Sequence, residues 1–223
     1  MPTRKKQPPA EPDRTRREAI LDGAFNAFAR RGYRDTVVDD IAASAQTSKG
    51  GIYFHFPTKE AIFRELMRTT ADKLIAKVEK AVASETDPIA RAEVAIRTVL
   101  ATFSGHRTTA RLLFLDAIGA GRAFQAETNA LHARFAALIE GYLDEAVAAG
   151  IVPPLDTRVA SIAWFGALNE VVARWLLADK PARLEDAYPT LRAVLLRSVG
   201  VSEERIATIP PGAGAGQFPD ATR

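Results

Sequence analysis

Long and short stretches of helical periodicity alternate over residues 17–63, and this alternation is the feature that most narrows the possible folds. Apolar side chains recur on one helical face over residues 20–28. Gly32 follows, and glycine commonly ends helices. Two short helices are predicted next, at about 36–45 and 48–55, and a long helix comes after them. Two short helices joined by a tight turn and flanked by longer ones form a helix-turn-helix.

The residues at the ends of these segments predict where each helix begins. Thr36 and Asp39 fit a capping box, in which the Thr36 hydroxyl accepts a hydrogen bond from the backbone at Asp39. Ser48 is expected to cap the second short helix. Pro57 then interrupts the chain, and the long helix is predicted from residue 59 to about residue 84. Apolar residues at helical spacing are expected in the core: Ile41, Ile52, Phe54 and Phe56.

The rest of the chain is also expected to be helical. Helical periodicity continues from about residue 88 to about residue 199, without the alternation typical of strands. Breaks are expected where glycine and proline gather: at Gly105, 119–121, 150–154 and 180–181. The fold class predicted from these patterns is all-α, with about nine helices.

Composition excludes several classes of site. The chain has no cysteine and only three histidines, so disulfides, thiolate catalysis and cysteine-based zinc sites are excluded, and neither a metal site nor a cofactor is expected. No stretch reaches the roughly 18 apolar residues of a membrane span, and the N-terminus lacks the apolar segment of a secretory signal. These absences predict a cytoplasmic protein without a membrane partner.

Positive charge is concentrated at the start of the chain. Six basic residues stand against two acidic ones before residue 18. Residues 1–12 are also polar and contain proline, which is typical of a disordered arm. Basic arms of this kind either remain solvated or enter the minor groove of DNA.

The residues of the helix-turn-helix carry a resemblance to a known family. The run of 47 residues from Arg17 to Phe63 resembles the DNA-binding domain of the TetR (tetracycline-repressor) family along its whole length, without a gap. The matching positions are Ile20-Leu21, Phe28, Gly32-Tyr33, Thr36, Asp40-Ile41-Ala42, Ser48-Lys49-Gly50, Ile52-Tyr53, His55-Phe56 and Lys59-Glu60. One position departs from the family pattern: Gln46 stands where the turn normally carries glycine, so it must take a left-handed or altered geometry at some cost.

The resemblance implies a DNA-binding surface. The positions that correspond to family DNA contacts, or lie beside them, are Thr36, Thr47, Ser48, Lys49, Gly50, Gly51, Tyr53, His55 and Lys59. Physical reasoning agrees for several of them: glycines allow the backbone to approach DNA closely, and Lys49 can reach a guanine edge or a phosphate. Tyr53, His55 and Lys59 carry donors suited to the DNA backbone. Thr36 has a second interpretation, as a helix cap only.

The resemblance also implies how the chain is divided. It predicts a disordered basic arm at 1–12, a helix-turn-helix DNA-binding domain at 13–60, a helical ligand-binding and dimerisation domain at 61–199, and a disordered tail at 200–223. The segment 159–177 is apolar on nearly all sides. In TetR-like proteins the last two long helices of each subunit form a four-helix dimer interface, and this segment fits one of those helices. A homodimer supplies the two-fold symmetry of a pseudo-palindromic operator.

A ligand site is expected among the helices that enclose the pocket in this family. Its candidate residues combine aromatic surface with a few polar groups: Phe103, His106, Arg107, Phe114, Phe124, Phe135, Trp164, Phe165, Asn169 and Arg174. Such a mixture suits a small hydrophobic or amphipathic effector. The segment 166–175 resembles regulators of fatty-acid metabolism that bind acyl-CoA.

The predicted function is a ligand-responsive transcriptional regulator, a repressor that leaves its operator when the effector binds. A constitutive or protein-regulated DNA-binding factor, without a small-molecule effector, is the alternative within DNA binding. Two other classes fit less well. An enzyme is disfavoured because the sequence has no GxSxG, paired-histidine or metal pattern. A helical module that binds protein would show little salt dependence in any binding to DNA.

Overall fold

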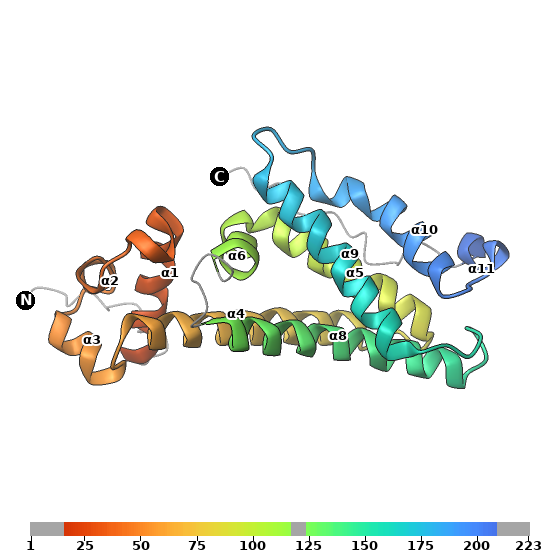
Figure 1. The fold of residues 1–223 in the computed structure, drawn as a ribbon, viewed down its shortest axis with the longest axis horizontal. Helices are drawn as coiled ribbons and strands as arrows, with labels where there is room; N and C mark the ends of the chain where they lie inside the picture. Colours follow the sequence, from red (N-terminus) through yellow and green to blue (C-terminus); the bar gives the residue numbers. More distant parts are fainter. Residues whose placement is uncertain (1–15, 117–123, 209–223) are drawn as a thin grey trace, which may run out of the picture. The chain divides into compact units, whose positions relative to one another are not determined.

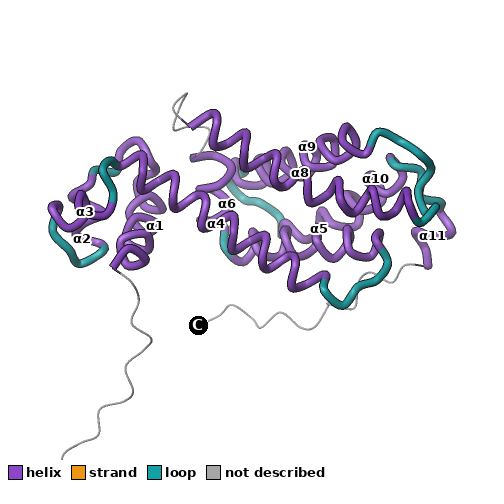
Figure 2. The backbone as a smooth tube through the Cα atoms, turned by 90° about the horizontal axis from the view of Figure 1, so that it is seen from below, coloured by secondary structure: helices purple, strands orange, loops and turns teal. Residues whose placement is uncertain are grey.

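The computed structural model describes residues 16–116 and 124–208, and every regular element in this part of the chain is a helix (Figure 2). The α-helices are α1 (Arg16–Asp35), α2 (Val38–Ser44), α3 (Lys49–His55), α4 (Lys59–Val82), α5 (Pro88–Gly105), α6 (Arg107–Arg111), α8 (Gln125–Ala148), α9 (Thr157–Leu177), α10 (Tyr188–Ser198) and α11 (Glu203–Thr208). A π-helical turn, η1 (Leu112–Asp116), follows α6, and a 3₁₀-helix, η3 (Leu184–Ala187), precedes α10. The all-α prediction is confirmed. The expected arm at 1–12 and the expected break at 119–121 lie outside the described residues.

The chain forms two compact units that divide after residue 66. The division falls within α4, so this one helix contributes residues to both units. None of the helices among the described residues has the length and apolar character needed to cross a membrane.

The first unit packs α1, α2, α3 and the start of α4 around a small apolar core (Figure 1). Ile20, Ile41 and Ile52 are fully buried. The rings of Phe28 and Phe63 meet edge to face, with centroids 5.2 Å apart, which ties α1 to α4. The apolar periodicity of the sequence therefore predicts most of this core correctly.

Close packing inside the first unit depends on a glycine in the middle of α1. A Cβ atom added at Gly23 would lie 2.6 Å from the Cβ and 2.7 Å from the backbone nitrogen of Ala45. Such distances leave no room for any side chain. Gly23 is thus the residue that lets α1 approach the turn after α2, although glycine weakens a helix interior.

The start of α2 differs from the predicted capping box. The helix begins at Val38, and the Oδ2 atom of Asp40 accepts a hydrogen bond of 3.1 Å from the backbone N–H of Val37. Thr36 does not cap the helix: its hydroxyl donates to the backbone carbonyl of Gly32 at 2.7 Å. The prediction of a Thr36–Asp39 box is wrong because the chain turns back at Gly32, whose φ is +74°, and carries Thr36 into the interior.

The turn between α2 and α3 adopts the left-handed geometry expected for its non-glycine residue. Gln46 has a φ of +50°. Its N–H donates to the carbonyl of Ala43, and the N–H of Thr47 donates to the carbonyl of Ala42, which is the hydrogen-bond pattern of a Schellman motif. The two backbone bonds hold the angle between α2 and α3 and offset the cost of a side chain at this conformation.

In the second unit α8 packs against both α5 and α9, and α10 packs against α5. Aspartates cap the start of two of these helices: Asp87 accepts from the backbone N–H of Ile89 at 2.8 Å, and Asp156 accepts from that of Val159 at 3.0 Å. The Trp164 indole N–H donates to the Ser198 hydroxyl at 3.0 Å and joins α9 to the end of α10.

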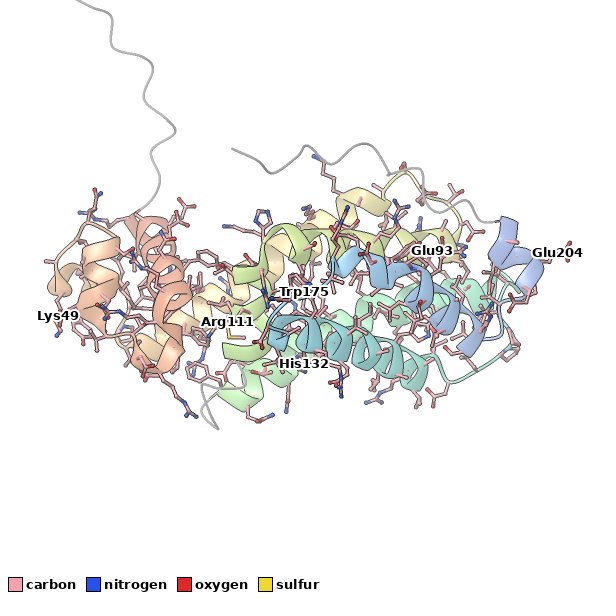
Figure 3. All side chains as sticks on the ribbon, turned by 90° about the horizontal axis from the view of Figure 1, so that it is seen from above. Lys49, Glu93, Arg111, His132, Trp175 and Glu204 are labelled. Carbon is pink, nitrogen blue, oxygen red and sulfur yellow. The ribbon has the colours of Figure 1, made fainter. Side chains whose placement is uncertain are left out.

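The predicted disordered tail begins too early. Residues 203–208 form α11, and Val201 and Ile206 are buried. The carbonyl of Ile206 accepts a hydrogen bond of 2.7 Å from Arg192, whose guanidinium also contacts the buried carboxylate of Glu93 at 2.6 Å (Figure 3). Composition alone missed this segment because much of what holds it is polar: besides its two buried apolar side chains, Arg205 pairs with Asp87 and Glu203 pairs with Arg197. Residues 209–223 lie outside the described part of the chain.

Candidate DNA-binding surface and effector cavity

The orientation of α3 is fixed by one cap and one buried residue. The Ser48 hydroxyl accepts a hydrogen bond of 3.0 Å from the backbone N–H of Gly51, as the sequence predicts for an N-cap. Ile52 is fully buried and anchors the helix to the first unit. With about 100° between successive residues, the outward face of α3 then carries Gly50 and Phe54. Ser48, Lys49 and Gly50 are exposed at the start of the helix.

Lys49 lies at the exposed end of α3 beside an acidic side chain (Figure 3). Its Nζ atom is 3.0 Å from Oδ2 of Asp39 on α2, and both side chains are more than half exposed. This hydrogen bond is the main reason why the pKa of Lys49 is raised above its usual value. A guanine edge or a phosphate would compete with Asp39 for the same ammonium group.

The two glycines of α3 serve different purposes. A Cβ atom at Gly51 would lie 2.6 Å from the Thr47 hydroxyl, so a larger residue there would displace the Thr47 side chain. A Cβ atom at Gly50 would meet only the Ser48 hydroxyl, at an ordinary 3.8 Å. Nothing in the described part of the chain requires Gly50, although glycine costs a helix up to about 1 kcal/mol relative to alanine. Its small size leaves the start of α3 open to a surface that approaches from outside.

Two residues predicted to contact DNA have other roles. Thr36 is fully buried, so its side chain cannot reach DNA. The ammonium group of Lys59 donates to the backbone carbonyls of Thr36 at 2.8 Å and Tyr33 at 2.9 Å, with a longer bond of 3.3 Å to Arg34. It also lies over the Tyr33 ring, 4.5 Å from the centroid. Lys59 thus satisfies backbone carbonyls at the C-terminal end of α1. The sequence could not distinguish this role from a phosphate contact.

Three aromatic or imidazole side chains follow one another at the end of α3. Tyr53 is 46% exposed and His55 is half-buried. Phe54, predicted in the core, is 85% exposed, and its ring meets that of His55 edge to face with centroids 5.1 Å apart. The core prediction for Phe54 is wrong because it stands two positions after Ile52, and residues two apart on a helix point in nearly opposite directions.

The second unit encloses a cavity of about 70 Å³. Its wall is formed by side chains of α4, α5, η1, α8 and α9, and it contains no charged residue: Leu74, Val78, Ala92, Ala95, Ile96, Val99, Phe103, Phe114, Phe135, Leu138, Ile139, Tyr142, Trp164, Phe165, Leu168, Asn169 and Val172. The Trp164 indole is already bonded to Ser198. This leaves the Asn169 amide and the Tyr142 hydroxyl as the polar groups of the wall. Burial raises the pKa of Tyr142, so its hydroxyl stays protonated.

Six of the ten side chains predicted to bind ligand line this cavity: Phe103, Phe114, Phe135, Trp164, Phe165 and Asn169. The other four do not. Phe124 is buried outside the wall, and His106 is exposed. Arg107 donates to the carbonyl of Leu176 at 2.9 Å and so ends α9, while the Arg174 side chain is 80% exposed and paired with Glu170. Both arginines thus have partners within the protein rather than in the cavity.

The sequence missed the aliphatic half of the wall. Five positions of α5 face the cavity at helical spacing, and only the aromatic one was expected: Ala92, Ala95, Ile96, Val99 and Phe103. The periodicity of α5 was visible, but aliphatic residues on a buried face look the same whether they meet a cavity or another helix. No group of three or more acidic or histidine side chains among the described residues is arranged to hold a metal ion.

Comparison with known protein families gives two matches that together span most of the chain. Residues 20–66 match the family described as bacterial regulatory proteins, tetR family, and residues 85–197 match a tetracyclin repressor-like C-terminal domain. The chain belongs to the TetR family. The resemblance of residues 17–63 is thereby confirmed, and the chain is a DNA-binding transcriptional regulator.

Relatives and solved structures with similar folds include regulators of fatty-acid metabolism. The fatty acid metabolism regulator protein of Bacillus subtilis is 25% identical over 162 residues, 72% of this chain and 84% of that protein. The structure of a B. subtilis regulator FadR in complex with stearoyl-CoA has a TM-score of 0.75 at 23% identity, and covers 83% of this chain and 98% of that one. The repressor KstR2 of Rhodococcus jostii is 41% identical over 83 residues, 37% of this chain and 41% of that protein.

Proposed function

We propose that this TetR-family regulator is a homodimeric repressor whose effector inserts a long apolar chain into the cavity of the second unit, and that this effector is a fatty acyl-CoA thioester. It binds a pseudo-palindromic operator through α3 and is not an enzyme. We expect it to act in the cytoplasm, with residues 13–60 as the DNA-binding domain and 1–12 as a basic arm that contacts DNA or remains in solvent. The uncharged wall of the cavity is the observation that carries the proposal.

The chemistry of the wall selects the effector. Burying an unpaired charge in such a cavity costs far more free energy than a protein has to spare, so the inserted part of the ligand must be neutral and mostly hydrocarbon. No hydrogen bond to the Asn169 amide is found within the described residues. A neutral acceptor on the ligand, such as a thioester carbonyl, would satisfy it. The charged nucleotide part of an acyl-CoA would remain outside this wall.

Similar regulators support the acyl-CoA class. The B. subtilis FadR structure was solved with stearoyl-CoA, and another structure of the same fold is a fatty acid degradation regulator from Bacillus halodurans, with a TM-score of 0.77 at 22% identity over 86% of this chain and all of that one. A wall of aliphatic and aromatic side chains, built mainly from α5, α8 and α9, suits a hydrocarbon chain better than a polar drug-like molecule.

The size of the cavity suggests how ligand and DNA are coupled. Pockets that hold drug-sized ligands measure about 300–1,000 Å³, whereas this one measures about 70 Å³. A long chain must therefore part the surrounding helices. Leu74 and Val78 of α4 belong to the wall, while Ile62 and Phe63 of the same helix are buried in the first unit. A shift of α4 on ligand binding would alter the spacing of the two α3 helices in the dimer and favour release from DNA.

On the DNA side, Lys49 and Gly50 are the residues that we expect to meet the major groove, with Tyr53 and His55 near the DNA backbone. Thr47, Ser48 and Gly51 shape the turn that presents them. Gly50→Val should therefore abolish DNA binding while the unit stays folded. The added side chain would clash with DNA, but it would meet no close atom of the protein itself.

The homodimer is proposed to form through α9 and α10. Exposed apolar side chains follow one face of α9 at helical spacing: Val159, Ile162 and Leu177. Gly166 lies on that face with no neighbouring atom within 4 Å, and Val194 of α10 is 57% exposed. Ile162→Glu should convert the dimer to a folded monomer in sedimentation experiments, whereas Ala130→Glu, on an exposed position of α8, should leave the dimer intact.

A cavity-filling variant tests the effector site. Trp164 belongs to the wall, so its fluorescence in a Trp175→Phe background reports what enters the cavity. Palmitoyl-CoA should change this fluorescence at micromolar concentration, Ala95→Phe should abolish the change, and Ala130→Phe on the exposed side of α8 should retain it. Fluorescence that responds equally in both variants would remove the cavity from the proposal. No response to any acyl-CoA would favour a regulator without a small-molecule effector.

A further inference from the structure

The outward face of α3 presents a large apolar side chain that the protein itself does not use. Phe54 is 85% exposed, the highest exposure among the large apolar side chains of the described residues. Its ring meets that of His55 edge to face, with the centroids 5.1 Å apart. Holding a phenylalanine in water forgoes about 1.5–3 kcal/mol relative to burial, so its position at this surface calls for a partner.

The position of Phe54 on the helix identifies that partner. Phe54 stands four residues after Gly50, so both lie on the face opposite the buried Ile52. Gly50 has open space where a side chain would be, which lets a surface come close, and Phe54 is the large group that the same surface would then meet. In a TetR-family regulator the surface that approaches α3 is the major groove.

The chemistry of the ring limits what it can recognise in the groove. Phenylalanine has no donor for a phosphate or for a base edge, so hydrogen-bonded recognition is excluded. The one apolar group that a base pair presents in the major groove is the thymine 5-methyl. We propose that Phe54 is a specificity-determining residue that packs against thymine methyl groups, one set in each half of the operator. This inference rests on the proposed use of α3 as the DNA-reading helix.

The test combines a change in the protein with a change in the DNA. The full-length dimer is used to select a tight duplex from a randomised pool, and the same duplex is then made with deoxyuridine in place of thymine, which removes only the methyl groups. Burial of one methyl corresponds to about a fourfold change in affinity. We expect wild-type protein to lose about fourfold for each contacted methyl, and Phe54→Ala to bind the thymine and uracil duplexes equally.

Controls separate this inference from the DNA-binding proposal. Phe54→Ala should unfold at the temperature of the wild type, since the side chain is exposed, and Phe54→Leu should retain part of the preference for thymine. If Lys49→Ala weakens binding while Phe54→Ala does not, α3 reads DNA but Phe54 has no part in it. If Phe54→Ala weakens both duplexes to the same extent relative to wild type, the ring contacts the sugar or orders the helix, and methyl recognition is wrong.

Discussion

Lys59 offers a sharp test because sequence and structure assign it different roles. The sequence predicts a phosphate contact, whereas in the structure the ammonium group bonds three carbonyls at the end of α1. Lys59→Met keeps most of the side-chain stem over Tyr33 and removes the charge. Hydrogen bonds from a charged group are worth about 1.5–3 kcal/mol each, but these three share one partly exposed cation, so we expect a total loss of about 3 kcal/mol.

The assay measures stability and salt dependence together. A loss of about 3 kcal/mol should lower the unfolding midpoint of the first unit by about 12 °C or more, and amide exchange should speed up at residues 33–36. At a temperature where the variant is folded, its log–log slope of DNA affinity against salt should equal that of the wild type. Lys49→Ala should instead flatten the slope by about 2 for a dimer, if each lysine meets one phosphate. Unchanged stability with a flatter slope for Lys59→Met would refute the structural role.

Three further predictions follow from the structure. Gly23→Ala should destabilise the first unit by about 1–2 kcal/mol in denaturant titration, because overpacking against Ala45 exceeds the gain in helix propensity. Gly141→Ala, with open space around it, should instead stabilise the protein by up to about 1 kcal/mol, and equal effects of the two changes would contradict the packing argument. Burial lowers the pKa of His132 below 6.5, so the stability that the neutral imidazole contributes is present above pH 6.5 and is lost as pH falls below that value. His132→Phe should therefore flatten the fall in unfolding temperature between pH 7 and pH 5. A profile identical to that of the wild type would exclude His132 as the source of the fall. Gly50→Ala should keep the unfolding temperature of the wild type or raise it while weakening DNA binding, and unimpaired DNA binding would separate Gly50 from the groove.

The fold of the first unit could be predicted because local signals agree there. Apolar periodicity, the Ser48 cap and the strained position of Gln46 all appear in the structure as the sequence predicts. Two details escaped because they depend on the path of the chain in three dimensions. Thr36 looked like a cap, yet the turn at Gly32 carries it inside, and Lys59 could only be seen to close α1 once the carbonyls 23–26 residues earlier were located.

The second unit was harder to predict for a different reason. Helices could be placed from breaks such as Gly105, but a cavity is a property of several helices together, and its aliphatic wall has no sequence signature. Polar residues misled the prediction most: Arg107 and Arg174 satisfy a helix end and a glutamate rather than a ligand. Asn169 was predicted for the same reason, and it does line the cavity.

The central claim is that an apolar chain in the cavity controls DNA binding. The most direct measurement follows the anisotropy of a labelled duplex from upstream of the coding region, bound by the dimer at fixed salt, during titration with acyl-CoA thioesters of increasing chain length. The account predicts release by long-chain thioesters but not by CoA alone, and loss of that response in Ala95→Phe with DNA affinity unchanged. Tight DNA binding that no thioester weakens, or release that persists in Ala95→Phe, would contradict it.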